Sequence, residues 1–351
     1  MFYEILYEII EARSVMTIGR PFNEMSNSGP LVSICIPTYN RAGMLQQSLQ
    51  SALAQTFTDF EVIISDNASQ DATESVVRSY SDPRIRYIRN AKNLGHRANM
   101  NQCLALARGK YITILFDDDM MMPENVATKV EILSRTPGLG FVYSKYHLID
   151  GEGRITEYDT MRGHGRERTE DARETCEDIL PAMFNTINAP TVVFQRACYE
   201  RLGGFTDKLK LVFDYEYWMR IAVYYPVVFL AQPLIKWRVH AGTLTNVHVG
   251  SDEVQKLKDV VAAKQLILRQ HGHVLSSDLK KKVWQQMAAR IVGHAEAMRE
   301  ENAAKAQVRA FLLEMSRSFP RILSERGIWK AFLKSMVNRQ AIDALKRISP
   351  S

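Results

Sequence analysis

Three aspartates follow directly on an apolar stretch near the middle of the chain. The segment YITILFDDDMMMP, from Tyr111 to Pro123, places Asp117, Asp118 and Asp119 side by side. Adjacent carboxylates repel one another, so their crowding is costly unless a cation or a set of donors offsets it. Hard divalent ions such as Mg²⁺ and Mn²⁺ prefer carboxylate and phosphate oxygens together. The cluster therefore predicts a metal ion that bridges the chain to a nucleotide diphosphate, with a solvated turn or a helix start as the alternative.

Two later segments offer further groups for chemistry. In FDYEYWMR, Asp214 and Glu216 are two residues apart and face apart on a helix, so only one can point into a site. The alternative is that both acids simply favour the first turn of a helix. In KWRVH, Arg238 and His240 alternate on a strand-like segment, so their side chains leave on the same face. Gly204, in a Gly-Gly pair, allows either a close backbone approach or a plain turn.

Apolar runs and segments of helical periodicity alternate from residue 31 to about residue 120. The expected strands are LVSICIP, FEVIISD, IRYIRN and YITILFD, and the expected helices between them are MLQQSLQSALAQ, DATESVVRSY and RANMNQCLALARG. This alternation is typical of a mostly parallel sheet with helices on both faces. Ligands of such sheets bind at the carboxyl ends of the strands. PTYNR, Asp66 and the three aspartates therefore converge on one rim.

Local signals predict two helix ends in this part. Asp71 with Glu74 three residues later has the pattern of a capping box. Gly109 follows the third helix and is expected as its C-cap residue. The three methionines Met120 to Met122 are expected to fill the core beneath the acidic segment.

The second half of the chain mixes strands and helices. GFVYSKYHLID and APTVVFQ are expected as strands, DYEYWMRIAVYY as a helix, and PVVFLAQPLIKWRVH as two short strands around Pro233. The charged residues 162–174 predict a surface loop. We expect an N-terminal amphipathic helix and linker over 1–30, an α/β domain over 31–250, and a basic helical region over 251–351.

Composition and charge limit the classes of protein. The chain has 351 residues with 46% hydrophobic and 24% charged residues, which is ordinary globular composition. No apolar run reaches the roughly 18 residues of a membrane-spanning helix, and the N-terminus lacks the features of a signal peptide. The four scattered cysteines indicate reduced, buried thiols and a cytoplasmic protein.

The C-terminal region carries the positive charge. Residues 251–351 contain 19 Lys and Arg against 10 Asp and Glu, whereas the first 250 residues contain 26 against 29. Phe311, Leu312, Met315 and Phe319 recur on one helix face, and so do Trp329, Phe332, Leu333 and Met336. Such helices could pack on the α/β domain or on another subunit as a homo-oligomer, or lie at the cytoplasmic face of an anionic membrane. We expect no nucleic acid partner, because no aromatic platform or known motif accompanies the charge.

Several segments in order resemble the family 2 glycosyltransferases. These are VSICIPTYNRAGMLQQSLQSALAQTFTDFEVIISDNASQDAT, NLGHRANMNQCLALARGKYITILFDDDMMMPE, LGGF, FDYEYWMR and WRVHAGTLT, which together span about residues 31–245. The resemblance implies the GT-A fold, a Rossmann-like α/β architecture with a mixed, mostly parallel sheet flanked by helices, here with a C-terminal helical extension. It implies a nucleotide-sugar half over 31–120 and an acceptor half over 140–245. It also implies an inverting transfer of a sugar from a nucleoside-diphosphate sugar with Mn²⁺ or Mg²⁺.

The resemblance assigns roles to the nucleotide-sugar half. The residues that would line the nucleotide pocket are Pro37, Tyr39 and Arg41. Asp66 would accept a hydrogen bond from the base, and Asp117 would meet the ribose. Aligned on Pro123, Asp118 holds the metal, in the family's DxD segment, with Asp119 as the fallback ligand. The chain departs from the family at Phe116, where many members have Asp, and at Met100, the usual place of an Arg, for which Arg97 would substitute in nucleotide-sugar binding.

Roles in the acceptor half follow from the same resemblance. Asp214 would be the catalytic base that takes the proton of the acceptor hydroxyl. Glu216 would bind the acceptor or a neighbouring backbone group, and Gly204 would approach the acceptor. His240 would reach the metal or the diphosphate. The residues that would close over the leaving group are Arg238, Thr243 and Thr245. Electrostatic stabilisation of the transition state would be largest at the departing diphosphate.

The resemblance and its rivals define the functional hypotheses. The acceptor is expected to be a glycan or a lipid-linked molecule, as in assembly of cell-surface polysaccharide. One rival is a sugar nucleotidyltransferase, but PTYNRAGM lacks the Gly-rich basic loop that a triphosphate needs. The other rival is a non-catalytic carbohydrate- or partner-binding module with the same fold. The joint presence of Asp66, the three aspartates, Asp214 and His240 argues against it.

Overall fold

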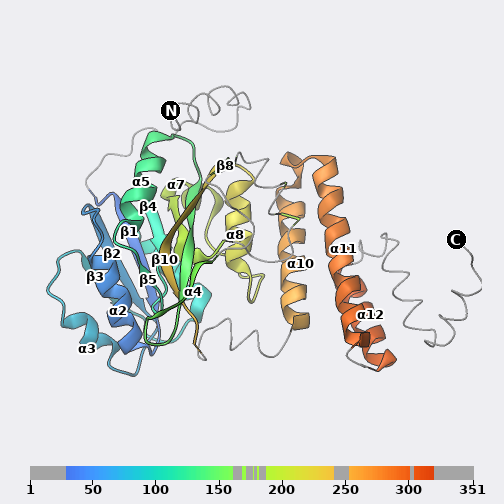
Figure 1. Ribbon diagram of the computed structural model, residues 1–351, viewed down its shortest axis with the longest axis horizontal. Helices are drawn as coiled ribbons and strands as arrows, with labels where there is room; N and C mark the ends of the chain where they lie inside the picture. The colour runs from blue at the N-terminus through green and yellow to red at the C-terminus, as the bar shows by residue number, and fades with distance from the viewer. Residues whose placement is uncertain are drawn as a thin grey trace, which may run out of the picture. The chain divides into compact units, whose positions relative to one another are not determined.

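The computed structural model (Figure 1) describes residues 29–160, 168–170, 177, 180–181, 187–240, 253–300 and 304–319. The chain divides into two compact units, one made of Met1–Cys176 and Asn185–Ser251, the other of Glu177–Phe184 and Asp252–Ser351. The expected N-terminal helix, most of the loop 162–174, and Thr243 and Thr245 lie outside the described residues.

The first half of the larger unit has the predicted alternation of strands and helices. Its parallel strands are β1 (Val32–Thr38), β2 (Phe60–Asp66), β3 (Ile85–Arg89) and β4 (Tyr111–Ile114). They lie in the order β3-β2-β1-β4, so that β1, first in the chain, is central among them. Each position of β1 and β2 is buried, which explains their continuous apolar runs.

The second half extends the same sheet with mixed strand directions. Its strands are β5 (Met120–Met121), β6 (Phe141–Ile149), β7 (Ile155–Thr160), β8 (Arg168–Glu170), β9 (Val192–Gln195) and β10 (Val227–Arg238). The order continues from β4 through β9, β6 and β10 to β5, with β7 on β6 and β8 on β10. The prediction of a mixed sheet flanked by helices, followed by C-terminal helices, is confirmed.

One expected pair of strands is a single strand. The segment around Pro233 was predicted as two short strands, but β10 runs through it and pairs with β6 from Val227 to Arg238. Proline cannot donate to the ladder, and the pairing register shifts on both sides of Pro233. The strand therefore continues through Pro233 with a bulge-like shift of the pairing register, where the sequence predicts a break between two strands.

Helices cover both faces of the first half of the sheet. The helices of this unit are α2 (Ala42–Leu53), α3 (Thr73–Arg78), α4 (His96–Leu106), α5 (Asn125–Arg135), η1 (Ala189–Thr191), α7 (Arg196–Leu202) and α8 (Phe213–Ala222). Ile34 and Ile36 of β1 share a core cluster with Leu45 of α2 and Val126 of α5. The alternate residue Cys35 instead contacts α4, where its thiol lies 3.6 Å from the Cys103 carbonyl oxygen.

The predicted caps of α3 and α4 differ from the structure. Glu74 is not part of a capping box, because it pairs with Arg78 and Arg89. Asp71 lies one residue before the N-cap and accepts hydrogen bonds from the backbone N–H and the hydroxyl of Thr73. Helix α4 ends at Leu106, and Gly109 packs directly against the backbone of β1.

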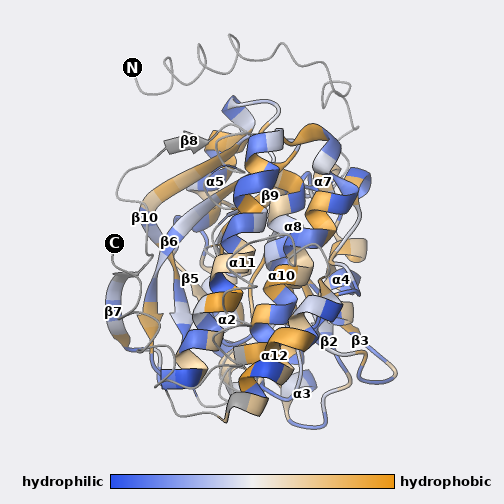
Figure 2. Cartoon of the chain, turned by 90° about the vertical axis from the view of Figure 1, so that its right-hand side faces the viewer, coloured by the Kyte–Doolittle hydropathy of each residue, from blue (hydrophilic) through white to orange (hydrophobic). Residues whose placement is uncertain are grey.

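The smaller unit consists of amphipathic helices. They are α10 (Glu253–Gln270), η2 (Gly272–Val274), α11 (Ser277–Glu300) and α12 (Lys305–Ser318). Each long helix carries hydrophobic and hydrophilic residues along its length (Figure 2). The predicted apolar face of α12 is buried, with Phe311, Leu312, Met315 and Phe319 at most 6% exposed. Among the described residues no helix is long and apolar enough to span a membrane. Trp329 and the residues of its face lie outside them.

The contact of Gly109 with β1 generates a prediction. A Cβ at this position would lie 2.5 Å from the Ser33 nitrogen and 2.6 Å from the Val32 carbonyl carbon, and both are backbone atoms that cannot yield cheaply. Gly109→Ala should therefore lower the free energy of unfolding by about 1–3 kcal/mol, measured by urea denaturation. The exposed Gly43 of α2 has no atom near its Cβ position, so Gly43→Ala should be neutral or slightly stabilising. Equal stability of the two variants would contradict this account.

Candidate active site

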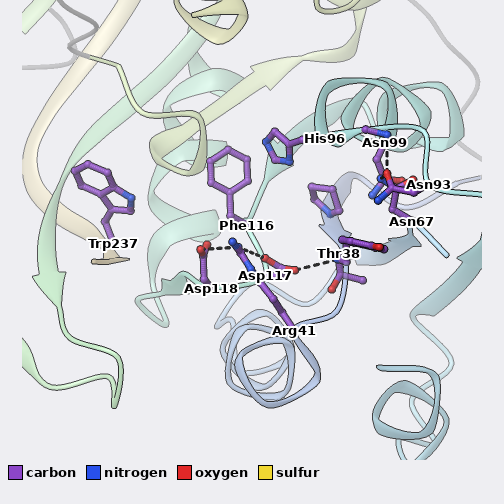
Figure 3. Close-up of a pocket in the computed structure, with 13 residues that line it drawn as sticks. Thr38, Arg41, Asn67, Asn93, His96, Asn99, Phe116, Asp117, Asp118 and Trp237 are labelled. Atoms are coloured by element: carbon purple, nitrogen blue, oxygen red, sulfur yellow. Dashed lines mark hydrogen bonds and ion pairs between the residues drawn. The ribbon is translucent and has the colours of Figure 1, made fainter. Parts of the chain in front are cut away.

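A cavity of about 290 Å³ lies where the carboxyl ends of the first strands meet α4 and β10. Figure 3 shows it in close-up, with Trp237 on one side of the acidic residues and a group of asparagines on the other. The residues that line it are Pro37, Thr38, Tyr39, Arg41, Asn67, Asn93, Gly95, His96, Asn99, Phe116, Asp117, Asp118 and Trp237. The cavity therefore brings together part of the predicted rim, namely residues of PTYNR with Asp117 and Asp118, without Asp66 and Asp119.

Strand pairing explains why the ends of β1 and β4 meet in this cavity. The two strands are parallel neighbours with Cys35 opposite Ile114, so the residues that follow them come out at the same edge. The Tyr39 backbone N–H accordingly donates to Asp117 Oδ2 at 3.3 Å. Of the predicted site residues, the cavity brings together Pro37, Tyr39, Arg41, Asp117 and Asp118.

A guanidinium group bridges the first two aspartates. Arg41 Nη1 lies 3.0 Å from Asp117 Oδ1 and 2.7 Å from Asp118 Oδ2. Burial, and after it the charge of Asp118, raise the pKa of Asp117 to about 6 in spite of this contact. Burial works against the charge of Arg41 as well, but Asp117 and Asp118 outweigh it and raise the pKa of the guanidinium. The pair of carboxylates is thus held by a cation from the chain itself.

His240 joins the acidic centre from the end of β10. Its Nε2 lies 3.2 Å from Asp118 Oδ2, so two of the three residues predicted as metal ligands are adjacent. A carboxylate oxygen and an imidazole nitrogen suit Mn²⁺, and a diphosphate can supply further oxygens. The residues therefore fit a metal that the chain and a nucleotide would share. The described part of the chain contains no group of three or more His, Cys, Asp and Glu placed to hold a metal alone.

Asp119 points into the protein and away from the cavity. Its carboxylate is fully buried, and Oδ1 accepts a hydrogen bond of 2.8 Å from the Arg238 backbone N–H. Burial, and after it the charge of Asp118, raise the pKa of Asp119 well above its usual value. This placement argues against the fallback role of Asp119 as a metal ligand, because its neighbour Asp118 is the one that reaches the cavity.

Arg238 is also buried and holds the acidic segment from behind. Its Nε donates to the Asp118 carbonyl oxygen at 2.6 Å, and its other nitrogens donate to Asp150, Gly151 and Gln47. The sequence predicts that Arg238 closes over the leaving group. That prediction is wrong, because the guanidinium is already bound to these partners. It is a positioning residue for the loop that carries Asp118.

The end of β2 presents an amide to the cavity where a carboxylate was expected. Asp66 is fully buried and accepts hydrogen bonds from the Ser69 backbone N–H at 2.8 Å and the Tyr87 hydroxyl at 2.5 Å. Burial, and after it Asp66, raise the pKa of that tyrosine. Asn67, the next residue, lines the cavity instead. Asp66 is therefore not placed to read a base.

Asparagines form a fixed wall at this end of the cavity. Asn67 Nδ2 donates to Asn93 Oδ1 at 2.8 Å, and Asn67 Oδ1 accepts from the Leu94 backbone N–H at 2.8 Å. Asn99 is locked in turn, because it exchanges hydrogen bonds with the hydroxyl and the carbonyl oxygen of Ser65. These amides provide donors and acceptors without charge.

Aromatic rings connect the cavity to the start of α8. The His96 ring lies 5.4 Å from that of Phe116 and 6.1 Å from that of Phe213. Burial, and after it the charge of Arg41, lower the pKa of His96 to about 4, so its imidazole is neutral at pH 7. Asp214 follows Phe213 in the first turn of α8. Asp214 is not among the residues that line the cavity, and its Oδ1 accepts a hydrogen bond of 2.8 Å from the Tyr215 backbone N–H.

Three other predicted residues have structural partners outside the cavity. Glu216 is 1% exposed and binds Arg220 through both carboxylate oxygens, at 2.9 and 3.0 Å. Arg220 also donates to the carbonyl oxygen of Gly204, whose Cβ position lies 2.4 Å from Asn101 Oδ1. Arg97 donates to the carbonyl oxygens of Asp207 and Leu209. These contacts show that Glu216, Gly204 and Arg97 serve packing and structural hydrogen bonding. The predicted roles in binding the acceptor or the nucleotide are not supported for them.

The sequence reasoning missed several residues that line the cavity. They are Thr38, Asn67, Asn93, His96, Asn99 and Trp237. Asn67 could have been found, because it directly follows a strand whose neighbours also end in polar residues. Trp237 alternates with Arg238 on β10 and lies on the opposite face from it, so the burial of Arg238 determines that Trp237 faces the cavity.

Known sequences resemble this chain over most of the unit that contains the cavity. A sequence model of the family described as glycosyl transferase family 2 matches residues 33–195. An uncharacterized glycosyltransferase of Rickettsia prowazekii is 28% identical over 258 residues, which cover 71% of this chain and 79% of the relative. An uncharacterized protein of Mycobacterium tuberculosis is 30% identical over 225 residues, which cover 62% of this chain and 69% of the relative.

Solved structures share the fold. Staphylococcus aureus TarS 1–349 in complex with UDP-GlcNAc is 17% identical with a TM-score of 0.59, over 87% of this chain and 90% of that chain. The mannosyltransferase PcManGT from Pyrobaculum calidifontis in complex with GDP-Man and Mn²⁺ is 18% identical with a TM-score of 0.55, over 96% of both chains. At these identities the likeness concerns the fold.

The pKa of Asp117 generates a prediction about stability. The value of about 6 in the folded chain lies above the ordinary value of about 3.9, so the folded state holds a proton that the unfolded state releases. As the pH rises from about 4 to about 6, ionisation of Asp117 progressively lowers the free energy of unfolding. Above about pH 6 this loss is complete and no longer changes with pH. Asp117→Asn should stabilise the ligand-free protein by about 1–2 kcal/mol at pH 7.5 and by much less at pH 4, measured by urea denaturation. A variant that is less stable than the parent at pH 7.5 would show that the pair with Arg41 outweighs the burial.

Proposed function

The chain belongs to glycosyl transferase family 2, and from this we propose that its cavity transfers a sugar, with inversion, from a nucleoside-diphosphate sugar to an acceptor hydroxyl. The protein is a glycosyltransferase with the GT-A fold. The observation that carries the finer proposal is the convergence of Asp117, Asp118 and Arg41 in one cavity with an asparagine wall, with His240 in contact with Asp118.

The donor is proposed to lie along the cavity from the asparagines to the acidic centre. The amides of Asn67, Asn93 and Asn99 face the place where a nucleobase would bind, and Asn67 takes the part first expected of Asp66. Asp117 would meet the ribose. Asp118 and His240 would hold Mn²⁺ or Mg²⁺, which supplies positive charge to the diphosphate when it is bound. The bound UDP-GlcNAc of TarS and the GDP-Man and Mn²⁺ of PcManGT support a donor of this class.

Asp214 is proposed as the catalytic base. An inverting transfer is a single displacement, so a carboxylate must accept the proton of the acceptor hydroxyl as the new bond forms. Of the two acids in the first turn of α8, Glu216 is engaged by Arg220. Asp214 follows Phe213, whose ring packs against the cavity residue His96. This position supports Asp214 as the base.

The acceptor is proposed to be a glycan or a lipid-linked molecule, as polysaccharide assembly would require. A cytoplasmic enzyme with a lipid-linked acceptor would have a use for basic helices at an anionic membrane. Assembly of two copies through the same helices is the alternative that the basic region 251–351 leaves open.

Donor binding can be tested by thermal shift. UDP-, GDP- and dTDP-sugars, with a CMP-sugar as the monophosphate control, are screened with Mn²⁺. One of the diphosphate classes should raise the melting temperature because it binds only the folded state. EDTA, or the substitution Asp118→Asn, should remove most of that rise, since the metal links the diphosphate to the chain. Donor stabilisation that ignores both changes would refute the metal proposal, and the absence of any nucleotide effect would refute the donor site.

Catalysis is tested by Asp214→Asn. The variant should bind the donor normally but release nucleoside diphosphate roughly 10²–10⁴-fold more slowly, because it lacks the general base. The matched control is Asp278→Asn, which removes an acid from the first turn of α11 and should not change the rate. Turnover that survives in Asp214→Asn would show that another group accepts the proton.

A further inference from the structure

One nitrogen of Arg41 occupies the place between the two carboxylates that face the cavity. Nη1 alone contacts both Asp117 Oδ1, at 3.0 Å, and Asp118 Oδ2, at 2.7 Å. Figure 3 shows the Arg41 side chain rising between the two aspartates, with both contacts drawn. Asp118 Oδ2 is also the oxygen nearest to His240. A divalent ion bound by Asp118 would compete for this oxygen.

We propose that Arg41 is a resident counter-cation that keeps free divalent metal out of the site and admits it only together with a diphosphate. This inference rests on the proposed function, since it concerns the donor site. It makes Arg41 a specificity-determining residue, because the site would discriminate between a metal ion alone and a metal–nucleotide complex.

The charges of the site support this order of binding. The two aspartates and Arg41 leave one net negative charge, in a place where the aspartate side chains are 7% and 10% exposed. A divalent ion by itself would turn this into one net positive charge with little water to screen it. A nucleoside-diphosphate sugar brings two negative charges of its own, so the metal and the donor together leave the net charge unchanged.

The geometry of Arg41 allows it to change partners. The residue is the N-cap of α2 and has no side-chain capping bond, so the helix does not depend on its guanidinium. Its side chain is 23% exposed, more than either aspartate. Guanidinium groups bind phosphate oxygens as well as carboxylate oxygens. When a diphosphate arrives, Arg41 can exchange Asp118 for a phosphate oxygen while the metal takes the carboxylate.

Electron paramagnetic resonance of free Mn²⁺ tests the proposal on the full chain without nucleotide. The parent should bind Mn²⁺ weakly, and Arg41→Met should bind it at least tenfold more tightly. The matched control is Arg84→Met, which removes an Arg–Asp pair of 2.7 Å with Asp82 outside the cavity and should leave Mn²⁺ affinity unchanged. An Arg41→Met variant that binds Mn²⁺ no more tightly than the parent overturns the proposal.

A second variant separates charge from folding. Arg41→Lys keeps a positive charge beside the carboxylates and should retain the weak Mn²⁺ binding of the parent, which gives a result even if Arg41→Met does not fold. Tight binding of Mn²⁺ alone by Arg41→Lys or by the parent would overturn the inference. UDP, GDP and dTDP binding with excess Mn²⁺, measured by calorimetry, keeps the two claims apart. If one of these nucleotides binds while free Mn²⁺ already binds the parent tightly, only the role of Arg41 fails. If none of them binds, the donor site itself fails.

Discussion

Three neighbouring carboxylates at a desolvated strand end are the constraint around which this molecule is arranged. Asp117, Asp118 and Asp119 are all buried, so their repulsion is little screened by water. Groups on two sides of the cluster offset this repulsion. Arg41 bridges Asp117 and Asp118 at the cavity, and Arg238 holds Asp119 and the Asp118 carbonyl oxygen from the core. One side of the cluster is left for chemistry, and the other is structural.

This arrangement joins the two halves of the sheet at one point. Arg41 comes from the start of α2 in the first half, whereas Arg238 ends β10 in the second. The short strand β5, directly after the aspartates, pairs with β10 as well. The acidic segment therefore cannot keep its position without the part of the chain that also carries Trp237 and His240. The proposed donor site and the residues around the sugar that it would transfer therefore depend on the same contacts.

Buried polar groups beneath the cavity fix the residues at its surface. Asp66 binds Ser69 and Tyr87, and Ser65 holds Asn99, so the asparagine wall rests on a network whose members satisfy one another. On the other side, Arg220, which is held by Glu216, fixes the turn after α7 by donating to the Gly204 carbonyl oxygen. These groups are of residue types that can do chemistry, yet their contribution is to place Asn67 and to tie that turn to α8. Polar residues near a site thus divide into those that face it and those that hold it.

The sequence by itself determined the alternation of strands and helices and the rim where Pro37, Tyr39, Arg41, Asp117 and Asp118 meet. It could do so because buried parallel strands leave continuous apolar runs, and polar residues after such runs must come out at one edge. Only the tertiary structure decided which side each side chain takes. A shift of one residue exchanges Asp66 for Asn67, or Asp118 for Asp119, and one-dimensional spacing does not fix that register. Likewise, Arg97 and Arg238 donate to groups far away in the chain, and the buried Glu216 pairs with Arg220 of its own helix, because a buried charge must be paired wherever the fold supplies a partner.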